Sequence, residues 1–287
     1  MNLRKQSLFT VMTALLLTVL FTTLLPSTAS AQETNKTYII GTDITFAPFE
    51  YKDADGEYKG IDVDLLDAIA KDQGFNYELR PLGFSAALQA LETNQVDGMI
   101  AGMSITPERE ESFDFSDPYF ESGVVMAVSE DNDQIATYED LEGKTVAIKV
   151  GTTGAAFAQS IQEEYGFEVN TFEDSANMYE DVQTGNSDAA FEDYPVMAYA
   201  IQSGLELKIP TDPEPGDNYG FAVNKDQNAE LLEMFNNGLI NIRANGTYDE
   251  IIDTYLGDTS QTETANLGFF GLIQQNGGEL LKGLGRT

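Results

Sequence analysis

The stretch AGMSITPERE, residues 101–110, places one cation among hydroxyls and carboxylates. Ser104 and Thr106 can donate hydrogen bonds, and the planar guanidinium of Arg109 can hold a carboxylate through two parallel hydrogen bonds. A second turn, VGTTG at 150–154, follows a β-branched run and precedes a helical pattern, so its backbone N–H groups also suit an anion. This turn lacks the lysine of a phosphate-binding loop, which makes a nucleotide a weak interpretation.

Acidic and aromatic side chains follow other strands that the pattern predicts. Asp43 and Phe46 come after the first β-branched run, Phe84 follows a later one, and Glu192 and Asp193 end the last strand of the second half. Ligands of open α/β sheets bind at the carboxyl ends of the strands. A guanidinium, a carboxylate and two aromatic faces at these ends predict a site for a zwitterion, and an amino acid satisfies all three. The alternatives are core packing for the two phenylalanines and a turn carboxylate for Asp193.

Composition narrows the function classes. The formal net charge of -33, from 48 acidic and 15 basic residues, gives a negative field that repels phosphate backbones, so we expect no nucleic-acid partner. The chain has no cysteine and no histidine, which excludes disulfides, the usual zinc sites and Ser-His-Asp catalysis. The acidic turns at 53–57 and 130–134 do not match the spacing of a calcium loop. We expect no catalytic residue, no metal site and no cofactor.

Both ends of the chain differ in character from the rest. Basic residues at 4–5, an apolar run to residue 25 and an A-x-A ending at 29–31 predict a cleaved secretory signal over residues 1–31. An uncleaved membrane anchor is the alternative. After residue 257, a polar linker leads into a tail, 258–287, that is too short and polar to span a bilayer. We expect export across the cytoplasmic membrane, to the periplasm or the outer face of the cell membrane.

Strand and helix patterns alternate between these ends. The first half predicts strands at 37–43, 77–82 and 96–102, a hairpin at 51–60, and helices at 62–74 and 85–95, the second capped by Ser85. The second half repeats this order, with strands at 144–150, 168–173 and 187–193 and helices at 155–166 and 175–185. A strand at 219–224 and two helices over 228–257, broken at Asn245–Gly246, are expected to return to the first half. This order predicts the α/β class, with two similar lobes.

Seven ordered motifs resemble a known family. They are GTDITFAPFEY, GIDVDLLDAIA, AGMSITPERE, FDFSDPYF, KVGTTG, FEDYP and NGTYDEI. Over residues 36–257 their order resembles that of the extracytoplasmic polar amino-acid-binding proteins of ABC importers, the glutamine-binding type in particular. The resemblance implies a type II periplasmic-binding-protein clamshell, with lobe 1 at 36–123 and 222–257, lobe 2 at 124–221, and two hinge crossovers. The hinge candidates lie beside the crossovers: Tyr119, Gly123, Tyr219 and Gly220.

The resemblance also implies how the main-chain groups of an amino acid would be held. Arg109 would pair with the α-carboxylate, helped by Ser104 and by the backbone N–H of Thr153. Asp193 and the carbonyl of Gly102 would hold the α-ammonium. The guanidinium would then face the cleft, while its acidic neighbours would lie on the outer surface.

The residues implied to contact the ligand side chain favour different amino acids. Phe46 and Phe84 would sandwich it, and Asp43 and Lys149 would reach its far end. Lys149 favours glutamine and disfavours arginine or lysine by like-charge repulsion. Glu192, however, stands where the glutamine-binding pattern has a histidine, so glutamate, arginine and histidine remain alternative ligands.

On this resemblance the chain is a receptor that binds a free amino acid without turnover and delivers it to an ABC permease and its ATPase. Residues 258–287 resemble the segment that leads into the first membrane helix of transporters whose binding domain is fused to the permease. Membrane contact is expected only through the transporter or a missing C-terminal region. Two other functions stay open: a cyclohexadienyl dehydratase-like enzyme on the same fold, with Glu192 as general acid, and a sensory domain of a membrane receptor.

Overall fold

The computed structural model describes residues 36–257. The predicted signal at 1–31 and the predicted linker at 258–287 lie outside the described residues. Within 36–257, no helix has both the length and the apolar character that crossing a membrane requires.

The first sheet has five strands in the order β5-β1-β6-β14-β7. Their bounds are β1 Thr37–Thr42, β5 Asn76–Pro81, β6 Gly98–Met99, β7 Phe113–Phe115 and β14 Ala222–Asn224. β1 pairs in parallel with β5 and β6, whereas β14 runs antiparallel to β6 and β7. A small separate sheet is formed by β2 Thr45–Phe46, β3 Glu50–Lys52 and β4 Tyr58–Lys59.

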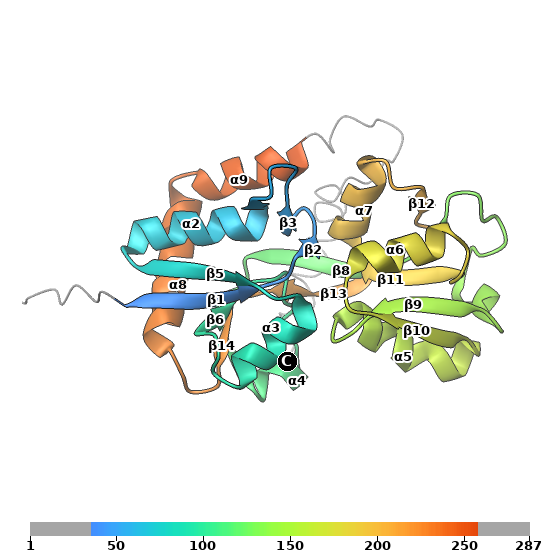
Figure 1. Cartoon of the computed structure of the whole chain (residues 1–287), viewed down its shortest axis with the longest axis horizontal. Helices are drawn as coiled ribbons and strands as arrows, with labels where there is room; N and C mark the ends of the chain where they lie inside the picture. Colours follow the sequence, from blue (N-terminus) through green and yellow to red (C-terminus); the bar gives the residue numbers. More distant parts are fainter. Residues whose placement is uncertain (1–35, 258–287) are drawn as a thin grey trace, which may run out of the picture. The chain divides into compact units, whose positions relative to one another are not determined.

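Helices cover both faces of the first sheet (Figure 1). They are α2 Ile61–Gln73, α3 Phe84–Glu92, α8 Ala229–Ala244 and α9 Thr247–Leu256, with the short α4 Pro107–Glu110 beside them. Because successive strand residues point to opposite faces, Tyr38 and Ile40 enter the core with α2, α8 and α9, while Ile39 packs in the core with α3. The two C-terminal helices therefore return to the first sheet, as the sequence predicts.

The second sheet has six strands, in the order β10-β9-β11-β8-β12 with β13 also paired to β8. Their bounds are β8 Phe120–Ser129, β9 Thr145–Lys149, β10 Glu168–Phe172, β11 Ala189–Asp193, β12 Leu207–Lys208 and β13 Glu214–Tyr219. The helices beside it are η1 Tyr138–Leu141, α5 Thr153–Tyr165, α6 Ser175–Gln183 and α7 Tyr194–Gln202. The predicted α/β class is confirmed, with parallel strands at the centre of each sheet.

Strands β8 and β13 pair with each other where the chain passes between the two sheets. Their backbones approach so closely that a Cβ on Gly216 would lie 2.3 Å from the carbonyl oxygen of Ser122. A side chain at this position would push the strands apart, so glycine is required. Tyr119 and Tyr219 meet here, where the Tyr119 N–H donates to the Tyr219 carbonyl. The hinge role of these residues stays a prediction, as do the lobe boundaries.

Three local predictions are wrong. The predicted single strand at 219–224 is divided, since Tyr219 ends β13 and Ala222 begins β14 in the other sheet. The predicted strand at 96–102 is reduced to Gly98–Met99. Ser85 does not cap its helix, because α3 begins one residue earlier at Phe84, and the Ser85 hydroxyl instead donates to Glu173.

Truncation of the core helix α8 gives a test of this packing. Phe235 is fully buried and stacks on Phe221 with ring centroids 4.5 Å apart, so Phe235→Ala should lower the free energy of unfolding by about 3–5 kcal/mol. Ile240, 58% exposed on the same helix, is the matched control, and Ile240→Ala should change it by less than about 0.5 kcal/mol. Urea unfolding measures both, and similar losses in the two variants would contradict the assignment of this core.

Candidate functional site

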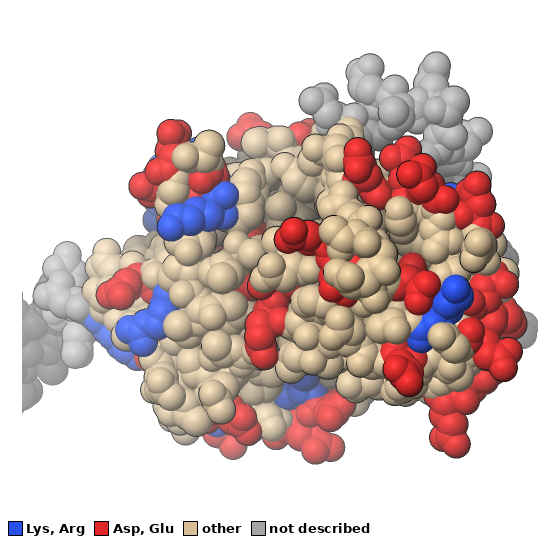
Figure 2. Space-filling model, turned by 45° about the vertical axis from the view of Figure 1, so that its right-hand side comes forward, with Lys and Arg blue, Asp and Glu red and all other residues tan. Residues whose placement is uncertain are grey.

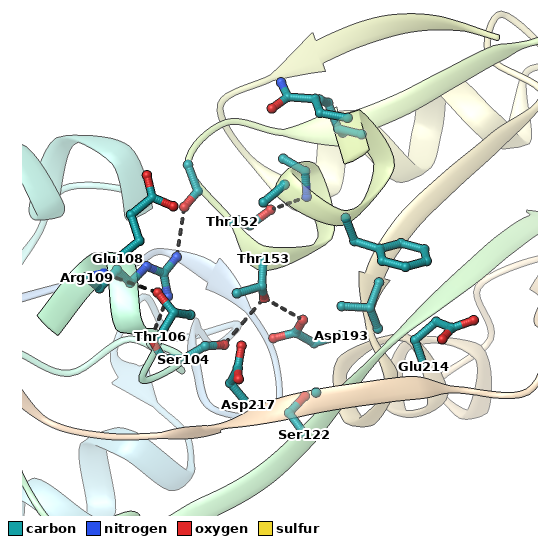
Figure 3. Close-up of a pocket in the computed structure, with 18 of the residues that line it drawn as sticks. Ser104, Thr106, Glu108, Arg109, Ser122, Thr152, Thr153, Asp193, Glu214 and Asp217 are labelled. Atoms are coloured by element: carbon teal, nitrogen blue, oxygen red, sulfur yellow. Dashed lines mark hydrogen bonds between the residues drawn. The ribbon is translucent and has the colours of Figure 1, made fainter. Parts of the chain in front are cut away.

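A small cavity lies between the residues that follow the strands of the two sheets. Its volume is about 10 Å³, and it is lined by Phe46, Phe84, Gly102, Ser104, Arg109, Lys149, Thr152, Thr153 and Asp193. A larger neighbouring cavity of about 850 Å³ shares several of these residues (Figure 3). The structure thus brings together eight of the ten residues predicted for the site, together with Thr152, which the sequence analysis missed. The hydroxyl of Thr152 accepts from Ala155 N and caps α5.

Arg109 is positioned by the short helix α4. Thr106 caps this helix by accepting from the Arg109 backbone N–H at 3.2 Å, which turns the side chain toward the cavity. The guanidinium donates to the Ser104 carbonyl at 2.8 Å and to the carbonyl of Gly151, in the turn after β9, at 2.9 Å. Burial lowers the pKa of Arg109, and no carboxylate of residues 36–257 lies within ion-pair distance of it. Arg109 is therefore a half-buried cation with neutral hydrogen-bond partners (Figure 3).

Asp193 is its counterpart at the end of β11. One carboxylate oxygen accepts from the Tyr219 hydroxyl at 2.5 Å, and the other accepts from the Thr153 hydroxyl at 3.4 Å. Burial, with the negative charge of Glu192 next to it, raises the pKa of Asp193 to about 7. No Lys or Arg of the described chain forms an ion pair with it. Asp193 is thus a buried carboxyl without a cationic partner.

Hydroxyl and backbone groups lie between these two charges. Ser104 Oγ and Thr153 Oγ1 are 3.4 Å apart and connect the two sheets. Gly102 has a φ of 51°, and its backbone N–H donates to Asp62 at 2.7 Å. A Cβ on Gly102 would lie 2.4 Å from the ring of Phe46, so this position requires glycine.

Lys149 and Asp43 form a fully buried ion pair at one end of the site. Burial disfavours the charged form of Lys149, but Asp43 and Glu192 outweigh it and raise the pKa of Lys149. The ammonium also donates to Ser175 at 3.2 Å and lies 5.0 Å from the Phe46 ring centroid. The ring of Phe84 instead faces Arg109, at 5.4 Å from the guanidinium carbon.

Asp43 and Glu192 do not line the small cavity, although both were predicted to be site residues. Both oxygens of Glu192 are engaged: one accepts from the Asp193 backbone N–H at 2.9 Å, the other from Tyr179 at 2.8 Å and Ser175 at 3.1 Å. Its predicted ligand contact therefore stays a prediction. Tyr179 and Ser175 lie within an ordinary helical pattern, and no sequence signal marked them.

The part of the chain that the structure describes holds no group of three or more acidic side chains placed to bind a metal ion. On the face shown in Figure 2, acidic side chains cover more of the surface than basic ones. The buried Lys149 and the half-buried Arg109 thus contrast with the acidic surface of this face.

Comparisons with known proteins agree on one family. Residues 38–258 match the family model described as bacterial extracellular solute-binding proteins, family 3. The chain is 34% identical to the arginine-binding periplasmic protein of Mannheimia haemolytica, over 84% of this chain and 98% of that one. It is 30% identical to the arginine-binding extracellular protein ArtP of Bacillus subtilis, over 78% and 88%.

Solved structures show the same fold. The open form of substrate binding domain 2 of Lactococcus lactis GlnP is 45% identical, covers 77% of this chain and 96% of that one, and has a TM-score of 0.56. An ancestral arginine-binding protein bound to glutamine is 38% identical, with coverage of 77% and 98% and a TM-score of 0.72. These likenesses confirm the predicted two-lobe binding-protein fold.

Substitutions around Asp193 should move its pKa in opposite directions. Glu192→Gln removes a negative neighbour and should lower the pKa of Asp193, whereas Tyr219→Phe removes a donor to the carboxylate and should raise it. Carbon-13 NMR titration of the side-chain carboxyl measures both. An unchanged pKa in Glu192→Gln would contradict the electrostatic coupling of the two carboxyls.

Proposed function

Because the chain belongs to family 3 of the bacterial extracellular solute-binding proteins, we propose that it is an extracytoplasmic receptor for a polar L-amino acid, with glutamine favoured. It would deliver this solute to the permease and ATPase of an ABC importer. The signal predicted at residues 1–31 would export it to the periplasm or the outer face of the membrane.

One observation supports this proposal most strongly: two opposite charges, the buried Asp193 and the half-buried Arg109, line one cavity, and neither has an ion-pair partner within residues 36–257. A buried charge is costly unless it is paired. The α-carboxylate of an amino acid would satisfy Arg109, and its α-ammonium would satisfy Asp193. Ser104 and Thr153 would complete the carboxylate end, and the Gly102 carbonyl would complete the ammonium end.

The far end of the site favours an amide. Lys149 offers N–H donors and Asp43 offers an acceptor, so together they match the carbonyl and NH₂ groups of a glutamine side chain. A second candidate ligand is arginine, because the relatives named above are arginine-binding proteins. The acidic groups Asp43 and Glu192 support that candidate, and the ammonium of Lys149 opposes it.

Binding would require the lobes to separate and close. The cavity of about 850 Å³ reaches Arg109 and Asp193, but the part of the site that Phe46, Phe84 and Lys149 line has a volume of only about 10 Å³. That part is too small for an amino-acid side chain, because Arg109 contacts Gly151 across the cleft and Ser104 approaches Thr153. On ligand entry, Arg109 would exchange the neutral Gly151 carbonyl for a carboxylate, which is a stronger acceptor. The ligand would then favour the closed form through its differential affinity for that form.

The alternative of a dehydratase receives less support. Its general acid would be Glu192, but both oxygens of this side chain already accept hydrogen bonds from protein donors. A catalytic acid must reach the leaving group with a free proton. We therefore expect saturable binding without turnover.

Isothermal titration of refolded residues 32–262 with glutamine, glutamate, arginine and histidine tests the receptor proposal. We expect one glutamine per chain, with Arg109→Ala raising Kd at least roughly thirtyfold, because it leaves the ligand carboxylate buried without its cation. Arg109→Lys should recover only part of the affinity, since lysine keeps the charge but loses the planar fork.

Arg80→Ala is the matched control. Arg80 donates to the Gln95 carbonyl and lines neither cavity of the site, so its loss should leave Kd within about twofold. Tight binding of arginine instead of glutamine would retain the receptor function and change the ligand. Failure of all four amino acids to bind would contradict the proposal.

Affinity should also depend on pH through Asp193. Only the ionised carboxylate can hold an ammonium, and the pKa of Asp193 is raised to about 7, so Kd should rise by up to about tenfold per pH unit as the pH falls below 7. Above pH 8 it should be nearly constant. In Glu192→Gln this rise should begin at a lower pH, and titrations from pH 5 to 8.5 measure the difference. Identical profiles would argue that Asp193 does not hold the ammonium.

A further inference from the structure

Two carboxyl groups lie behind the site without enough donors to satisfy them. Glu50 begins β3, Asp62 lies in the first turn of α2, and the side chains of both are 0% exposed. The two residues are neighbours in space, because the Asp62 backbone N–H donates to the carbonyl of Phe49, the residue before Glu50, at 2.9 Å. One oxygen of Asp62 accepts from the Gly102 backbone N–H at 2.7 Å and from the Tyr119 hydroxyl at 2.9 Å.

The remaining three oxygens, both of Glu50 and Oδ1 of Asp62, have no donor among the described residues. Two ionised carboxylates can only accept hydrogen bonds, so they cannot satisfy each other. Burying two unpaired neighbouring anions would cost far more than burying one. A hydrogen bond between the two carboxyls can form only if one of them carries a proton.

The charges that face this pair support the same conclusion. Asp43 adds repulsion, and Lys149 offsets it only in part because its ammonium already pairs with Asp43. Burial raises the pKa of Glu50 well above its ordinary value and that of Asp62 to about 6. Burial also raises the pKa of Tyr119, which keeps its hydroxyl protonated as a donor. Glu50 is therefore the better holder of the proton.

We propose that Glu50 and Asp62 share one proton at neutral pH, with Glu50 donating to Asp62, and that this pair positions Gly102 for the ligand ammonium. The role of Gly102 rests on the proposed function. Its N–H is held by Asp62 on one side, and the Phe46 ring packs against it on the other. The same Asp62 oxygen holds Tyr119, next to the first residue of β8, so one carboxylate fixes both the ammonium end and the crossover.

The pH dependence of unfolding in the ligand-free protein tests the shared proton. Between pH 6 and 8 the folded pair keeps one proton that the unfolded chain has lost, so the unfolding equilibrium constant should rise with pH. In Glu50→Gln the amide replaces the proton, and the rise should be about tenfold per pH unit shallower. Contributions of other groups, Asp193 included, are common to both proteins. Glu57→Gln, on the exposed hairpin nearby, should keep the wild-type slope.

Equal slopes for wild type and Glu50→Gln would overturn the shared proton. If Glu50→Gln does not fold, the carbon-13 shift of the Glu50 carboxyl in the wild-type protein decides instead. It should be that of a protonated acid at pH 7.5, and the shift of a carboxylate would reject the proposal. Neither measurement needs a ligand, so the pair is tested even if the receptor function is wrong.

Hydrogen exchange of the Gly102 amide tests the positioning role. Asp62→Asn keeps an oxygen for Gly102 and Tyr119 and supplies an N–H to Glu50, so amide protection should stay within about threefold of wild type. Asp62→Ala should lose at least tenfold in protection, and where wild type binds glutamine its Kd should rise at least tenfold. Wild-type protection of Gly102 in Asp62→Ala would refute the positioning role, whatever the ligand.

Discussion

The energetic cost of removing charged side chains from water is the constraint that shapes the cleft. Arg109, Asp193, Lys149, Asp43 and Glu192 lie within one small region, and a buried ion loses several kcal/mol of hydration unless its surroundings replace the water. The protein satisfies Lys149 and Asp43 with each other and Glu192 with three donors. Arg109 and Asp193 have only neutral partners within the protein, so these two charges gain most from a ligand that brings a charge of the opposite sign.

The fold brings these charged side chains together because each lies at or near the end of a strand. Asp193 ends β11 and Lys149 ends β9, while Arg109 sits on a single helical turn between β6 and β7. Because these ends face each other across two sheets, opposite charges meet without being neighbours in sequence. Two residues behind the cavity then hold the groups that line it. The Tyr219 hydroxyl, on β13, donates to the carboxylate of Asp193, and the carboxylate of Asp62, on α2, accepts from the Gly102 N–H.

Much of the site could be predicted from the sequence because its residues belong to short, contiguous motifs. Ser104 to Arg109 and the turn around Thr153 carry their own local geometry, and strand–helix alternation is visible from hydrophobic periodicity. The hydrogen-bond partners of Glu192 could not be predicted, since Ser175 and Tyr179 reach it only through tertiary packing. The proton inferred between Glu50 and Asp62 was missed for the same reason: burial decides protonation, and no residue pattern reports burial. The strand at 219–224 was misread because hydrophobicity does not tell which of two sheets a segment joins.

The close pairing of β8 and β13 has a mechanical consequence. A single extended segment can swivel about each of its backbone bonds, so a body tethered by it can turn in any direction. Two strands paired along their edges, as β8 and β13 are at Gly216 and Ser122, form a two-stranded ribbon. Such a ribbon resists twisting and sliding of one strand past the other, but it can still bend perpendicular to its plane. If the two halves open and close as the proposed function requires, this pairing would leave them one easy direction of bending, and it would bring Arg109 and Asp193 back to the same positions on closure.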